Sequence, residues 1–106
     1  MFGIVVEYDF SGDESEWRDA IDDFIGHINA DDRLRGRFSY QVNIRNDGGG
    51  RVHIGQWDEE ETLTYLQSQT FFSEFAGKVR NFAGGAPKAT TFKSITRTDI
   101  TRANRD

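Results

Sequence analysis

Two histidines are the side chains of this sequence that titrate nearest to neutral pH and could therefore transfer a proton. His53 lies within an apolar stretch that is typical of a strand, on its semi-polar face, where it could act as a general base. The alternative is a hydrogen bond at an interface between two sheets. We favour the interface, because an ordinary histidine pKa is not by itself evidence of catalysis.

The other histidine, His27, lies four residues after Asp23, so the two side chains share one face of a helix. Such a pair could supply two ligands to a metal ion, whereas protein metal sites usually have three or four. No third ligand stands at a suitable spacing, and we predict a surface pair and no metal. The absence of cysteine excludes disulfides, thiolate catalysis and iron–sulfur clusters.

Two further motifs are predicted to be structural. The run Gly48-Gly49-Gly50 lacks the GK[ST] ending of a phosphate-binding loop and is interpreted as a hairpin turn. The acidic run 59–61 is interpreted as the solvated start of a helix, capped by Asp58 with Glu61 completing a capping box.

Composition limits the class of protein. A chain of 106 residues forms one domain, and its 14 aromatic residues (nine Phe, three Tyr, two Trp) supply large core side chains. The hydrophobic fraction of 36% is low, which favours completing the burial with a second copy of the chain. A net charge of −5 argues against nucleic-acid binding. No stretch has the length of a membrane span, and we expect a cytoplasmic protein.

Apolar periodicity predicts four strands and two helical stretches. The strands are expected at 2–10, 38–45, 51–57 and 89–98, and the helical stretches at about 13–30 and 58–83, the second broken near 68–70. Three apolar sets are expected to face the core: Trp17, Ala20, Ile21, Phe24, Ile25 and Ile28; Leu63 and Leu66; Phe72, Phe75, Val79 and Phe82.

This order predicts an α+β fold, a ferredoxin-like β-α-β-β-α-β sandwich with a four-stranded antiparallel sheet. The domain is expected to span residues 1–98, followed by a polar tail at 99–106. Both helical stretches must then cover one face of the sheet, and a twin sheet is expected to cover the other. That open face is predicted to carry Val5, Glu7, Ser39, Gln41, Asn43, His53 and Trp57.

The chain resembles the antibiotic biosynthesis monooxygenase domain family of the dimeric α+β barrel superfamily over about residues 2–98. The resemblance is carried by Trp57 at the end of a strand, the acidic helix start 58–61, and the broken helix through Leu66, Ser68 and 71–75. It implies a homodimer paired sheet to sheet, with a cleft between the sheet and the helices of each subunit. Some members oxidise aromatic polyketides or quinols without metal or flavin, and others degrade haem.

Haem-degrading relatives have an Asn on the first strand, a Trp like Trp57, and a His about ten residues beyond it. Here the first strand offers Glu7 and Tyr8, and Gln67 stands near the histidine position. Haem degradation is therefore not expected, and no cofactor is predicted.

Two functions remain open. The first is a non-catalytic dimer that binds a small apolar or aromatic ligand in the sheet–helix cleft; the alternative is a cofactor-independent monooxygenase acting on a phenolic or quinol-like substrate. Trp57 either lines that cleft or only covers the edge of the sheet. The predicted ligand-binding residues are Trp57, Tyr65, Phe71, Tyr8 and Asn43. In the enzyme, His53 or Tyr40 would handle the proton.

Overall fold

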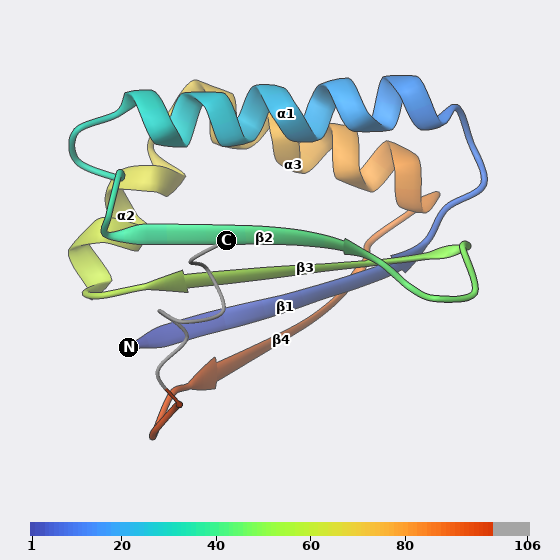
Figure 1. Ribbon diagram of the computed structural model, residues 1–106. Helices are drawn as coiled ribbons and strands as arrows, with labels where there is room; N and C mark the ends of the chain where they lie inside the picture. The colour runs from blue at the N-terminus through green and yellow to red at the C-terminus, as the bar shows by residue number, and fades with distance from the viewer. Residues whose placement is uncertain (99–106) are drawn as a thin grey trace, which may run out of the picture.

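The computed structural model describes residues 1–98, in which three helices pack on one face of a four-stranded antiparallel sheet (Figure 1). The elements are β1 (Phe2–Asp9), α1 (Glu14–Ala30), β2 (Phe38–Ile44), β3 (Gly50–Trp57), α2 (Glu60–Gln67), α3 (Thr70–Ala83) and β4 (Lys88–Lys93). The strand order β2-β3-β1-β4 confirms the predicted ferredoxin-like sandwich. The last strand ends earlier than predicted, and the expected polar tail at 99–106 lies outside the described residues.

Helix α1 follows from its sequence pattern. The Asp13 carboxylate accepts a hydrogen bond of 3.0 Å from the backbone N–H of Glu16, and this cap satisfies one of the free donors at the helix start. The predicted apolar stripe is confirmed, since Trp17, Ala20, Ile21, Phe24 and Ile28 are buried. Helices α1 and α3 lie side by side over the sheet (Figure 1).

The predicted break in the second helical stretch is also confirmed, and it separates α2 from α3. The Ser68 hydroxyl donates to the Tyr65 carbonyl at 2.6 Å, which offers the backbone an alternative to continuing the helix. The predicted cap is wrong in detail: Asp58 precedes the helix by two residues, and its carboxylate accepts from the Thr62 hydroxyl at 2.6 Å. Gly84 ends α3 in the left-handed conformation that glycine adopts most readily.

The register of the sheet corrects one prediction. Val42 of β2 and Val6 of β1 both stand opposite His53, and Phe38 stands opposite Trp57. Residues directly opposite one another in antiparallel strands point to the same face. His53 and Trp57 therefore face the helices, and the predictions that they lie on the open face and that His53 bonds across an interface are wrong.

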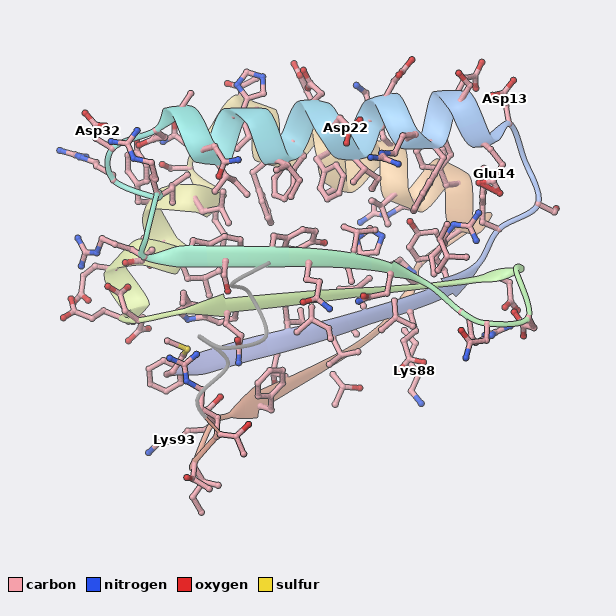
Figure 2. The ribbon with its side chains drawn as sticks, viewed as in Figure 1. Asp13, Glu14, Asp22, Asp32, Lys88 and Lys93 are labelled. Atoms are coloured by element: carbon pink, nitrogen blue, oxygen red, sulfur yellow. The ribbon has the colours of Figure 1, made fainter. Side chains whose placement is uncertain are left out.

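The face of the sheet away from the helices carries the alternate residues of each strand. Val5 and Glu7 of β1, Ser39, Gln41 and Asn43 of β2, and Val52, Ile54 and Gln56 of β3 belong to this open face. Lys88 of β4 points away from the helices (Figure 2). The open face is therefore a mixed surface with a central apolar pair, Val5 opposite Ile54, both half-buried. Within residues 1–98, no helix is long and apolar enough to cross a bilayer.

Candidate functional site

A cavity of about 320 Å³ lies between the sheet and the two helices α2 and α3. Its apolar wall includes Ile4, Val6, Phe38 and Trp57 from the strands and Leu63, Leu66, Phe72 and Phe75 from the helices. Four polar or charged residues also reach it: Tyr40, Gln67, Arg80 and Thr91. A largely apolar wall with a few polar groups is the usual composition of a small-molecule site.

The cavity has room because β3 carries a glycine at this point. Gly55 stands opposite Ile4 on one side and Tyr40 on the other. A β-carbon placed on Gly55 would approach the Tyr40 ring to 3.2 Å and Ile4 and Phe38 to 3.4 Å. A side chain at this position would therefore crowd the sheet side of the cavity, where a strand glycine leaves space for close approach.

From the Tyr40 hydroxyl, a chain of hydrogen bonds leads into the core. The Tyr40 hydroxyl lies 2.7 Å from Nδ1 of His53, and the other ring nitrogen of His53, Nε2, lies 2.7 Å from the Tyr8 hydroxyl. The Trp17 indole N–H donates to that same Tyr8 hydroxyl at 2.9 Å. The chain thus joins β2, β3, β1 and α1 through side chains alone.

Burial keeps the members of this chain uncharged at neutral pH. Desolvation, with a smaller contribution from the Arg51 guanidinium, lowers the pKa of His53 to about 4. Desolvation is also the main cause that raises the pKa of Tyr40 above its usual value, and a neighbouring Tyr8 phenolate would raise it further. The pKa of Tyr8 is raised by burial, which outweighs the opposing effects of the Trp17 hydrogen bond and Arg51.

Arg51 holds the far end of the chain in place. Its side chain is fully buried, and its guanidinium lies 4.5 Å from the centre of the Trp17 ring and 5.2 Å from that of Phe10. Nη2 donates to a carboxylate oxygen of Glu14 at 2.7 Å. Figure 2 shows Glu14 reaching from the start of α1 toward the sheet, whereas Asp13 points away from it. A cation held between two rings and a carboxylate is strongly fixed.

The structure brings together some of the predicted site residues. Trp57 and Tyr40 line the cavity, and His53 and Tyr8 lie behind Tyr40 in the hydrogen-bond chain. The Trp57 ring, which is 7% exposed, stacks on Phe38 at 6.0 Å between ring centres. Trp57 thus both packs against the strand edge and contributes to the wall.

Three predicted ligand-binding residues lie elsewhere. The Tyr65 hydroxyl donates to Asp31 at 2.7 Å, outside the cavity. Phe71 stacks on His27 of α1, with ring centres 4.8 Å apart. The Asn43 side chain donates to the backbone carbonyl of Val52 on the open face of the sheet.

Sequence reasoning missed several residues of the site. Gln67, Arg80 and Thr91 reach the cavity from three different elements, and Trp17 is the first donor of the chain. The sequence pattern marks Gln67 only as the residue that stands where haem-degrading relatives have a histidine. Helical spacing predicts that Trp17 lies in the core. A buried tryptophan usually finds a hydrogen-bond acceptor for its indole N–H, and this was the available signal for a polar partner.

The described residues contain no group of three or more His, Cys, Asp or Glu side chains that could hold a metal ion. Asp23 and His27 lie 3.7 Å apart on the exposed side of α1, as the predicted surface pair requires. The cavity offers phenol, amide, guanidinium and hydroxyl groups in place of such ligands.

No family model matches the sequence, and no curated protein matches it. Solved structures do match. Rv0793 from Mycobacterium tuberculosis superposes with a TM-score of 0.75 at 16% identity, covering 92% of this chain and 98% of its own. A Caulobacter crescentus protein provisionally described as an antibiotic biosynthesis monooxygenase gives 0.73 at 13% identity, with 90% of each chain covered. SnoaB, a cofactor-independent oxygenase from Streptomyces nogalater, gives 0.71 at 13% identity, covering 91% of this chain and 94% of its own. At such low identity these likenesses show that the chain shares the fold of these proteins.

Proposed function

We propose that this protein binds a small flat aromatic molecule in the cavity between the sheet and helices α2 and α3. The observation that carries the proposal is an aromatic-lined cavity of about 320 Å³ with a phenol, Tyr40, in its wall. This volume lies at the lower end of the roughly 300–1,000 Å³ typical of ligand pockets, which favours a guest of one to three rings. Phe72, Phe75 and Trp57 contribute aromatic rings to the wall against which such a guest would pack.

The test is calorimetric titration with a panel of quinols, quinones and phenolic polyketides against the protein and two matched variants. Ala76→Phe places a ring inside the cavity, because Ala76 lines it, and this variant is expected to lose binding. Ala83→Phe changes the same helix outside the cavity and is expected to retain it. A ligand that binds both variants equally well, or a panel that does not bind at all, would contradict the proposal.

A second candidate is a cofactor-independent monooxygenase acting on a phenolic or quinol-like substrate. It is supported by the shared fold with SnoaB and by the position of Tyr40, a half-buried phenol in the cavity wall that could stabilise a developing oxyanion. Dioxygen would be the oxidant: a methylene activated by a phenolic ring and one dioxygen give a carbonyl and one water. The low pKa of His53 makes it a weak base, so its role would be to hold Tyr40.

Oxygen uptake with the same panel separates the two candidates. The enzyme would be supported if the protein consumes oxygen with one of these compounds and the Tyr40→Phe variant does not, although its affinity for the compound stays within a few-fold. A ligand that binds tightly and consumes no oxygen would leave the binding protein as the function. The first outcome would support assigning this protein to the antibiotic biosynthesis monooxygenases.

We also propose a homodimer in which the open faces of two sheets meet. The support is the mixed character of that face, where Val5 and Ile54 stand opposite each other at its centre with no covering layer within residues 1–98. Pairing two copies would remove this apolar centre from water. Light scattering at micromolar concentration measures the proposed state directly, and a monomer would refute it.

A further inference from the structure

We propose that Trp17, Tyr8 and His53 are positioning residues that orient the Tyr40 hydroxyl hydrogen into the cavity, so that the site selects ligands with an oxygen acceptor. This inference rests on the proposed binding function and defines the chemical class of its ligand. It follows from the direction in which each hydrogen bond of the buried chain must run.

The direction is set at the Trp17 end. An indole N–H can only donate, so the Tyr8 oxygen accepts at 2.9 Å. The single hydrogen of the Tyr8 hydroxyl is then available for its other neighbour, Nε2 of His53, at 2.7 Å. If Tyr8 donates there, Nε2 carries no hydrogen.

A neutral imidazole carries its one hydrogen on the other nitrogen when Nε2 accepts. Nδ1 of His53 therefore donates to the Tyr40 oxygen, 2.7 Å away. The hydrogen of the Tyr40 hydroxyl is not used by His53, and among residues 1–98 the Tyr40 oxygen has no second hydrogen-bond partner. Tyr40 is one of the residues that line the cavity, and in the proposed arrangement its free hydrogen meets an acceptor there.

The opposite direction leaves a worse arrangement. If Nε2 carried the hydrogen, the Tyr8 oxygen would accept two hydrogen bonds, and its own hydrogen would need a third partner. Tyr8 is 8% exposed and lines no pocket found among residues 1–98, whereas Tyr40 lines the cavity and a second pocket beside β2. A buried donor without a partner is costly, so the tautomer with hydrogen on Nδ1 is favoured.

Two other features of the site support this direction. Arg51 holds the Trp17 ring from one side, at 4.5 Å, so the first donor of the chain is fixed. Burial in the core, and to a smaller extent the same guanidinium, disfavour the imidazolium, in which both nitrogens of His53 would donate. Tyr40 then presents a hydrogen-bond donor to the ligand. Such a donor suits the acceptor oxygen of a ketone, a quinone or a phenolate.

Nitrogen-15 NMR of the ligand-free protein tests the chain itself. Long-range correlations of the His53 ring distinguish a protonated from an unprotonated nitrogen by chemical shift. We expect Nε2 to be unprotonated and Nδ1 to be protonated at neutral pH, and the preference to be reduced in Tyr8→Phe. Tyr65→Phe, which removes a phenol outside the cavity, is the matched control and should leave it unchanged. A protonated Nε2 in the unaltered protein would overturn the inference.

Ligand selection is tested with 1-tetralone and tetralin, which differ by one carbonyl oxygen. A net hydrogen bond predicts that 1-tetralone binds roughly 3–10-fold more tightly. Tyr40→Phe should abolish that ratio, Tyr8→Phe should reduce it, and Tyr65→Phe should preserve it. Equal binding of both compounds would overturn the inference while leaving the binding function intact. Binding of neither would refute the function, and the NMR result would still decide the direction of the chain.

Discussion

The guanidinium carbon of Arg51 lies 4.5 Å from the centre of the Trp17 ring, so a buried cation of β3 rests on the first turn of α1. The fully buried Arg51 side chain is neutralised by Glu14, whose own side chain is 63% exposed. This contact anchors the start of α1 to the start of β3, at the end of the hydrogen-bond chain that leads to Tyr40.

Removing the carboxylate tests this anchor. Glu14→Ala leaves the buried guanidinium without its anion, and we expect a loss of about 1–3 kcal/mol in unfolding free energy, reduced by solvent access to Glu14. Glu16→Ala removes an acid from the same helical turn without touching Arg51 and should cost under about 1 kcal/mol. Urea unfolding measures both, and equal losses would show that the ion pair has no special role.

The low pKa of His53 predicts a defined dependence of stability on pH. The unfolded histidine binds a proton below its ordinary pKa of about 6.5, whereas the folded one does so only below about 4. The unfolded state therefore binds more protons in this window, and stability falls as pH falls from about 6.5 to about 4. The full effect is on the order of 3 kcal/mol.

Unfolding at a series of pH values, with a histidine titration by NMR, checks this dependence. His27→Gln should retain it, because His27 is half exposed on α1. His53→Gln should flatten it. A folded His53 that titrates near 6.5 would refute the prediction even if the variant is too unstable to study.

Trp57 is expected to affect stability and binding to different extents. Trp57→Ala removes a 7%-exposed ring stacked on Phe38 and should cost about 3–5 kcal/mol. Trp57→Phe retains a ring in the cavity wall, so its stability loss should be smaller while ligand affinity still changes. Thermal unfolding and titration of the same samples separate the two effects, and an unchanged affinity in Trp57→Phe would place Trp57 outside the binding site.

Gly55→Ala probes the sheet side of the cavity. The added methyl group would lie 3.2 Å from the Tyr40 ring, so either the ring shifts or the cavity narrows. Overpacking of this kind usually lowers the unfolding free energy by about 1–3 kcal/mol. Here the cavity can take up part of the added volume, so we expect the main effect to be weaker ligand binding. Gly26→Ala, on the open side of α1 where a β-carbon meets nothing within 4 Å, is the control. Equal affinities of the two variants would contradict the expectation.

The proposed dimer predicts a strong effect of one charge at the centre of the open face. Ile54→Glu places a carboxylate opposite Val5, where it would be buried against the second copy, and should produce monomers. Lys78→Glu changes a charge on the exposed side of α3, away from the open face, and should leave the dimer intact. Sedimentation velocity measures both variants; a dimer that survives Ile54→Glu would need another interface.

The predictable parts of this fold are those set by local spacing. The stripe of α1 and the break at Ser68 follow from apolar periodicity and from a hydroxyl that competes for the backbone. Local spacing does not decide which face of β3 turns toward the helices. Val52 and Ile54 are apolar enough to lie in the core, whereas His53 and Trp57 are residue types that could serve a site on the other face. Only the register with β1 and β2 decides between the two faces, and it places the polar histidine inside.

The candidate site was less predictable for the same reason. Tyr40 and Trp57 are indicated by residue type, but the other members of the hydrogen-bond chain that starts at Tyr40 come from three other elements. Arg51 is buried and is neutralised by Glu14, which lies 37 residues away at the start of α1. Such an ion pair leaves no pattern in the local sequence. Such contacts are decided by packing between distant segments.

The break between α2 and α3 gives the cavity two kinds of wall. The sheet side is held by continuous strand pairing, whereas the eight-residue α2, which has no side-chain cap at its start, contributes Leu63, Leu66 and Gln67 as a separate short piece. Changes in the residues of α2 would thus reshape one wall of the cavity without altering the pairing of the strands. Related proteins could diversify their guests by changing a single helical turn and keep the rest of the scaffold unaltered.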